Sequence, residues 1–164
     1  MARRFRGSET YKVDGKGRVS IPARFRRVIE QGDPEWETGK RPQILIVFGD
    51  DHQKCLELYT IEAAEEIDAR ISRLPRGSAL RRRAERKMNA YAYEAEIDEE
   101  GRLVLPAKHR DKIGLTDQAY FVAGSDTLEI WNPDTFAVVE AELDARDAEE
   151  LPLGVDILSL LPDL

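Results

Sequence analysis

Apolar and polar positions follow strand-like and helix-like periods in two successive series along the chain. In the first series, residues 9–13 and 18–21 are rich in β-branched and aromatic side chains, and the polar, glycine-rich segment 14–17 separates them. This pattern predicts two strands joined as a hairpin with a projecting loop. Pro22 suits the first position of a short helix whose apolar residues recur every three or four positions.

Further along, residues 44–48 form a wholly apolar run and residues 56–59 alternate, so we expect a strand at each. Thr60 is positioned to cap a following helix, because apolar residues then recur at helical spacing from Ile61 to Leu74. A Pro-Arg-Gly turn interrupts the pattern, and Ser78 can cap a second helix.

The second series repeats these elements in the same order. It predicts strands at 94–97, 103–105, 119–122 and 128–131 and helices at 106–113 and from about 133 to 145. The tail 151–164 is apolar but contains two prolines and a glycine, which predicts an extended arm. Such an arm either packs on its own body or bridges to a neighbouring subunit.

The two series are copies of one motif. Residues 14–26 align with residues 98–110 at an offset of 84 positions, and a repeat of this kind predicts two units of the same structure. Six aligned pairs are identical: Asp14/Asp98, Gly17/Gly101, Arg18/Arg102, Pro22/Pro106, Ala23/Ala107 and Arg26/Arg110.

The repeat continues at residues 56–59 and 128–131, but there the offset is 72. The first copy therefore carries extra residues, which we assign to surface loops at 31–42 and 50–54. The chain then divides into a first motif at 8–61, a helical connector at 62–90, a second motif at 91–134, and a C-terminal helix and arm at 135–164.

Composition restricts the possible classes of protein. A chain of 164 residues is long enough for one ordinary domain or two small intertwined halves. The single cysteine excludes an internal disulfide framework, and the sequence has no signal-like segment and no apolar run of about 18 residues. We therefore expect a cytoplasmic protein without a membrane partner.

The net charge of −7 is distributed unevenly. Residues 1–27 contain nine basic side chains and two carboxylates, which gives +7, whereas residues 134–164 contain nine carboxylates and one arginine, which gives −8. Charges separated by more than about 8–10 Å are screened at physiological salt, so the two regions can act independently. An acidic protein with a basic face is therefore expected.

The doubled Asp-x-x-x-Arg pair has two compatible interpretations. In the first, Asp14 with Arg18, and Asp98 with Arg102, form local ion pairs that stiffen their loops and contribute about 0–1 kcal/mol each. In the second, the aspartate orients the arginine while its planar guanidinium faces outward, where it suits phosphate oxygens or a guanine edge.

Further basic residues cluster around the first loop. Extended strands place alternate side chains on one side, so a stripe matched to a nucleic-acid backbone is predicted from Arg4, Arg6, Lys12, Lys16 and Arg18. Arg3 belongs to the same cluster. The basic run 81–87 lies on a predicted helix, and we interpret it as solvated surface or a subunit contact in preference to a DNA contact.

Candidate catalytic chemistry is sparse. His52 and Cys55 have no second pair of metal-ligand residues nearby, which disfavours zinc. His109 occupies the repeat position of Phe25, so we interpret it as an aromatic substitute. The sequence has no phosphate-binding glycine loop and no nucleophile elbow. We therefore expect no enzyme activity, no cofactor, no metal and no small-molecule substrate.

At its two loops the chain resembles the MraZ family of bacterial transcriptional regulators. Members carry two SpoVT-AbrB motifs, each with an Asp-x-x-x-Arg signature followed by a Pro-x-Arg/Lys segment. The similarity covers nearly the whole chain and includes the basic start Phe5-Arg6-Gly7. It implies an α+β fold: a pseudo-symmetric AbrB-like β unit, similar to a looped-hinge or double-split barrel, with short helices and two internal repeats.

The resemblance also implies a function and partners. It implies a nucleoid-associated, ring-shaped homo-oligomer that binds double-stranded DNA at promoter direct repeats upstream of the division and cell-wall gene cluster. Its DNA-binding signature corresponds here to Arg18 and Arg102, their partners Asp14 and Asp98, and the basic neighbour Lys16. The second loop departs from the first, because Glu99-Glu100 replaces Gly15-Lys16 and makes it acidic.

Two other functions remain open. One is a protein-interaction module like the antitoxins that share this motif, in which the C-terminal arm clasps a partner protein. The other is a small-molecule enzyme built on a barrel. A toxin encoded by a neighbouring gene would favour the first, and a deep polar pocket with convergent titratable groups would favour the second.

Overall fold

The computed structural model describes residues 4–124, 126–152 and 154–164. Its elements, in chain order, are β1 (Ser8–Lys12), β2 (Arg18–Ser20), α1 (Ala23–Gln31), β3 (Gln43–Val47), β4 (Leu56–Thr60), α2 (Ile61–Ser72), α3 (Ala79–Glu85), the π-helical turn η1 (Arg86–Ala90), β5 (Ala92–Glu96), β6 (Arg102–Val104), α4 (Ala107–Lys112), β7 (Gln118–Ala123), β8 (Thr127–Trp131), α5 (Pro133–Glu150) and the 3-10 helix η2 (Ile157–Leu160). The predicted α+β class is confirmed.

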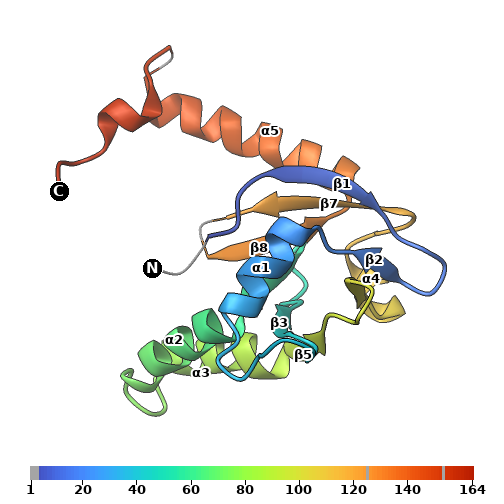
Figure 1. The fold of residues 1–164 in the computed structure, drawn as a ribbon. Helices are drawn as coiled ribbons and strands as arrows, with labels where there is room; N and C mark the ends of the chain where they lie inside the picture. Colours follow the sequence, from blue (N-terminus) through green and yellow to red (C-terminus); the bar gives the residue numbers. More distant parts are fainter. Residues whose placement is uncertain (1–3, 125, 153) are drawn as a thin grey trace. The chain divides into compact units, whose positions relative to one another are not determined.

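A six-stranded antiparallel sheet, in the order β1-β7-β8-β4-β3-β5, joins the two repeats (Figure 1). At its centre, β4 of the first repeat pairs with β8 of the second. Leu56 pairs with Ile130, and Leu58 pairs with Leu128. The repeat offset of 72 relates Leu56 to Leu128 and Leu58 to Ile130, so each pair is the repeat equivalent of the other. The sequence repeat therefore becomes an approximate two-fold axis through the middle of the sheet.

The first predicted hairpin does not form as a ladder between its own two strands. Strand β1 pairs with β7, and β2 pairs with β6, so both partner strands belong to the second repeat. Between the two strands of the predicted hairpin, the described residues form an isolated bridge from Val13 to Val19. Local spacing predicted the strands and the turn correctly but assigned the wrong partner strands. The exchange buries Val19 against Leu103, with exposed fractions of 1% and 0%.

One apolar core contains buried residues from both repeats. Phe25 of α1 lies in it stacked on Phe121 of β7, with ring centroids 6.3 Å apart. A second cluster lies where α2 and η1 pack against the sheet and includes Val47, Ile71 and Met88. Burial of such aliphatic and aromatic side chains stabilises a fold by about 1.5–3 kcal/mol each.

Helices α2 and α3 begin where the sequence predicts, whereas α1 and α4 begin one residue after the prolines that were expected to be their first residues. The Thr60 hydroxyl accepts from the backbone N–H of Ala63 at 3.1 Å and caps α2, and the Ser78 hydroxyl accepts from that of Arg81 at 3.3 Å and caps α3. Helix α2 buries its Ala63, Ala64 and Ile71 and ends at Ser72, before Leu74.

The chain separates into two compact units, residues 1–133 and 134–164. The C-terminal helix reaches Glu150, five residues beyond its predicted end, because four of the residues 146–150 are arginine, alanine or glutamate, which favour helices. The tail is not wholly extended as predicted, since Asp156 caps the short helix η2 there. Among the described residues, no helix is both long and apolar enough to cross a membrane.

Candidate nucleic-acid interface

The first Asp-x-x-x-Arg loop is organised by the carboxylate of Asp14. Its Oδ1 accepts from the backbone N–H groups of Lys16 and Arg18, both at 2.9 Å, and its Oδ2 accepts from Arg18 Nε at 2.6 Å. Gly17 closes the turn with a φ of +81° and donates its N–H to the carbonyl of Asp14. The backbone N–H of Arg18, followed by its guanidinium and the N–H of Lys16, lowers the pKa of Asp14 to about 2.

Asp14 holds the guanidinium of Arg18 through one nitrogen, Nε. No described residue accepts a hydrogen bond from its terminal nitrogens Nη1 and Nη2, and 35% of its side chain is exposed. Lys16 is also exposed at the tip of the loop, which projects beyond β1 and β2 (Figure 1). The free edge of the Arg18 guanidinium is therefore available, in a restrained orientation, to an anionic or acceptor group.

The second loop has the same backbone but different side-chain partners. Asp98 Oδ1 accepts from the N–H groups of Glu100 and Arg102, both at 2.9 Å, and these backbone bonds lower the pKa of Asp98. However, Arg102 Nη2 lies 2.8 Å from Glu100 Oε2, whereas its Nε is 3.5 Å from Asp98 Oδ2. The guanidinium edge that is free in Arg18 is therefore occupied in Arg102.

A residue that the sequence analysis did not single out further engages the second loop. Arg41, from the predicted surface insertion, makes a bidentate pair with Glu99, in which Nε and Nη2 each donate at 2.7 Å, and its Nη1 donates to Glu96 at 2.8 Å. Hydrogen bonds from Arg41 lower the pKa of Glu99. The sequence offered little signal for this contact, because 58 positions separate the partners.

The other residues of the predicted basic stripe lie at the two ends of β1. Arg4 and Arg6 precede the strand, Lys12 is its last residue, and all three are exposed. A strand rises about 3.3 Å per residue, so Arg6 and Lys12 are separated by up to about 20 Å along the chain. Arg3 lies outside the described residues.

The two repeats share an arginine at positions 26 and 110. Both arginines are half-buried, and each lies against the glycine of the opposite loop. Arg110 donates from Nε to the carbonyl of Leu105 at 2.8 Å and lies beside Gly17, while Arg26 lies beside Gly101. The sequence marked these two arginines, because they are identical in both copies of the repeat. Their position supports the exchange of strands and removes them from the candidate interface.

The candidate catalytic residues do not come together. His52 is exposed, with 95% of its side chain accessible, whereas Cys55 is buried and its Sγ lies 3.8 Å from Glu129. His109 is buried and stacks against Phe48 and Tyr93, with centroids 4.3 and 4.8 Å away, which confirms its interpretation as an aromatic substitute. Within the described ranges, no three His, Cys, Asp or Glu side chains are grouped as metal ligands.

Comparison with known families gives a match over two successive segments. Residues 4–87 and residues 88–152 each match the family described as "MraZ protein, putative antitoxin-like". The chain belongs to the MraZ family. Each matched segment contains one Asp-x-x-x-Arg loop, so the two MraZ segments correspond to the two copies of the internal repeat.

Similar proteins of the MraZ family span almost the same length. The chain is 51% identical over 161 residues to a protein named transcriptional regulator MraZ from Ruegeria pomeroyi, a match that covers 98% of this chain and 96% of the relative. Proteins of the same name from Cereibacter sphaeroides and Coxiella burnetii are 45% and 33% identical, over 99% and 93% of this chain and 98% and 93% of theirs.

Proposed function

We propose that this protein is a DNA-binding transcriptional regulator that contacts double-stranded DNA through its first loop, residues 14–18. The observation that carries the proposal is the restrained but half-free guanidinium of Arg18, beside the exposed ammonium of Lys16. Membership of the MraZ family and the names of the relatives support the same function.

The first loop supplies the specific contact in this proposal. An arginine fork can donate two hydrogen bonds to the O6 and N7 atoms of guanine, or bind phosphate oxygens. Lys16 and the basic residues Arg4, Arg6 and Lys12 add phosphate contacts, which position the protein without reading sequence. Asp14 acts through Arg18 by orienting it. Arg102 and Asp98 of the second loop contribute less, because carboxylates surround that arginine.

We infer further that the protein acts as a ring-shaped homo-oligomer on promoter direct repeats upstream of the division and cell-wall gene cluster, where it is nucleoid-associated in the cytoplasm. The two-fold relation between β4 and β8, together with the exchanged strands β2 and β6, supports an AbrB-like barrel for each subunit. In a ring, several weak loop contacts act together on spaced repeats, so avidity multiplies a modest affinity per subunit.

A gel-shift titration with the DNA upstream of the protein's own gene tests the proposal at two salt concentrations. We expect a retarded complex at low salt, weaker binding at high salt, and loss of binding in Arg18→Ala. The matched control is Arg102→Ala, which removes the same side chain from the second loop. Equal binding by the unaltered chain and Arg18→Ala would reject the assigned interface.

A second candidate function is a protein-interaction module that resembles an antitoxin. The antitoxin-like description of the matching family favours it, as do the exposed apolar residues of the C-terminal tail, which include Leu158 and Leu161. If this alternative is correct, deletion of residues 151–164 abolishes binding to a partner protein and leaves DNA binding unchanged.

A further inference from the structure

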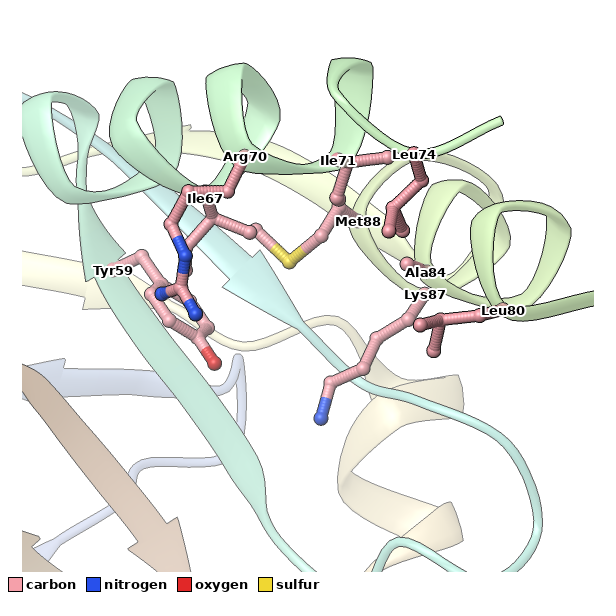
Figure 2. Close-up of a pocket in the computed structure, with 9 residues that line it drawn as sticks. All are labelled: Tyr59, Ile67, Arg70, Ile71, Leu74, Leu80, Ala84, Lys87 and Met88. Carbon is pink, nitrogen blue, oxygen red and sulfur yellow. The ribbon is translucent and has the colours of Figure 1, made fainter. Parts of the chain in front are cut away.

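An apolar groove of about 490 Å³ lies between α2 and the α3–η1 segment (Figure 2). Ile67 and Ile71 line it from α2, Met88 lines it from η1, and Tyr59 lies on the sheet side. Leu80, at the α3 side, is 65% exposed. Large exposed apolar surfaces next to a groove mark interaction sites in soluble proteins.

Two of the residues that line this groove, Arg70 and Lys87, are basic. Figure 2 shows Arg70 and Lys87 on opposite sides of it. The described residues provide no hydrogen-bond or ion-pair partner for the Arg70 side chain, whereas Lys87 pairs with Glu57 at 2.9 Å. Between residues 70 and 87 one carboxylate, Glu85, stands among eight basic residues: Arg70, Arg73, Arg76, Arg81, Arg82, Arg83, Arg86 and Lys87.

The C-terminal arm, residues 151–164, has the complementary chemistry. Leu158 and Leu161 are 66% and 63% exposed. Leu158 lies in η2, and Leu161 is the residue that follows its last turn and donates its backbone N–H to the carbonyl of Leu158 at 3.3 Å, so this short helix holds the two leucines near each other. The arm contains two acidic side chains, Asp156 and Asp163, and no Lys or Arg, and the last turn of α5 before it adds Asp147, Glu149 and Glu150.

Helix α5 carries this arm as a spacer. Its 18 residues all lie in the described part of the chain, and none of them is buried. A helix of this length separates the arm from Pro133 by about 27 Å. The chain therefore carries an exposed acidic apolar segment and an exposed basic apolar groove, the two halves of a heterologous contact that can close into a ring.

We propose that the arm of one copy binds the α2–α3 groove of a second copy. Leu158 and Leu161 enter between α2 and η1, and the carboxylates of the arm, Asp163 among them, face Arg70 and the basic residues around it. The proposal rests on the homo-oligomer of the proposed function and names the surfaces that form it.

Site-directed disulfide formation tests the contact in full-length protein. In a Cys55→Ala background, chains carrying Leu158→Cys are mixed with differently tagged chains carrying Leu80→Cys, and the products are separated without reductant. We expect a mixed disulfide-linked dimer. The matched control replaces Leu80→Cys by Val104→Cys, which alters an equally apolar side chain, 51% exposed, on β6. We expect about tenfold less product with this control.

Exchanging the charges of Arg70 and Asp163 adds a second test. A misfolded variant could lose the contact, but it would not regain the contact when the opposite charge is reversed as well. Arg70→Glu and Asp163→Lys should each reduce the yield of the Leu158→Cys and Leu80→Cys dimer, and their combination in one pair of chains should restore it. Because both positions are exposed, we expect neither change to alter the fold.

Four outcomes overturn the proposal. They are no mixed dimer, equal yields with Leu80→Cys and Val104→Cys, no restoration by the charge exchange, or an intrachain link as the main product when one chain carries both cysteines. Light scattering separates this failure from that of the proposed function. An unchanged oligomer without the mixed dimer rejects the arm contact alone, whereas a monomeric unaltered chain rejects the oligomer as well.

Discussion

Arg102 Nη2 forms an ion pair with Glu100 Oε2 at 2.8 Å, whereas the equivalent edge of Arg18 has no partner among the described residues. The two loops have the same backbone hydrogen bonds, so this difference comes from side chains alone. A glutamate in the second loop stands where the first has Lys16. The repeat thus provides two arginines in loops with the same backbone hydrogen bonds. Arg18 is available to a ligand, whereas Arg102 is already paired.

The first prediction compares these arginines. Arg18→Ala should weaken operator binding by about 1–3 kcal/mol per engaged subunit, because it removes a specific contact. Arg102→Ala should cost about 0–1 kcal/mol, on the scale of a surface ion pair. Fluorescence titration of labelled operator DNA measures both, with oligomer mass checked in parallel. Abolished binding in Arg102→Ala beside normal binding in Arg18→Ala would reverse the assignment.

The second prediction concerns the charge of the first loop. Lys16→Glu gives this loop a carboxylate at the position that Glu100 occupies in the second, close enough in sequence to pair with Arg18. We expect DNA binding to fall at least as far as in Arg18→Ala, with unchanged oligomer mass. Lys16→Gln is the control that removes charge without adding a carboxylate, and it should retain more affinity than Lys16→Glu.

The third prediction concerns the salt dependence of binding. If each subunit neutralises a few phosphates, the logarithm of affinity should fall with the logarithm of salt concentration by about 0.9 per contact. DNA with several spaced repeats should bind far more tightly than DNA with one, since the ring adds avidity. Titrations at several salt concentrations measure the slope. A slope near zero, or equal affinity for both DNAs, argues against phosphate contacts shared around a ring.

The fourth prediction concerns the close approach at Gly17. A Cβ atom there would overlap the carbonyl oxygen of Leu105, and the residue has a φ of +81°. Gly17→Ala should therefore lower the free energy of unfolding by about 1–3 kcal/mol. Gly15→Ala is the matched control, because a Cβ at Gly15 meets nothing within 4 Å. Chemical denaturation of both variants measures the difference, and equal stabilities would contradict the strand exchange.

The fifth prediction concerns His109. Burial against Phe48 and Tyr93, with the nearby cations Lys108 and Lys112, lowers its pKa below 6.5. The folded state therefore binds fewer protons than the unfolded state below pH 6.5. Its contribution to the free energy of unfolding is fully present above that pH and is lost as pH falls through 6.5 towards the folded pKa.

His109→Phe, which copies Phe25 of the first repeat, should remove this loss. Denaturant titrations at pH 7.5, 6.5 and 5.5 measure the effect. The exposed residue His52 provides the control, because its replacement by Phe should leave the decline below pH 6.5 in place. A decline that persists unchanged in His109→Phe would assign it to other groups.

Elements governed by near neighbours were predictable from the sequence. The caps Thr60 and Ser78 act three residues along the chain, and Asp14 reaches Arg18 within a single turn. Helical and strand periods depend on the local backbone in the same way. The repeat itself, visible as six identical pairs, indicated two equivalent units, and both were found in one sheet.

Contacts between distant parts of the chain were decided by the tertiary structure. Spacing along the sequence shows that residues 18–20 form a strand, but packing of Val19 against Leu103 selects β6 over β1 as its partner. In the same way, Arg41 reaches Glu99 across 58 positions. The sequence by itself determined the repeat, which is visible when the chain is aligned with itself. It also determined the periodic elements and the Asp14–Arg18 pair, because these depend on residues within a few positions. Strand exchange depends on which buried surfaces fit together when both repeats pack into one core, whereas the different pairing of the two arginines follows from the local replacement of Lys16 by Glu100.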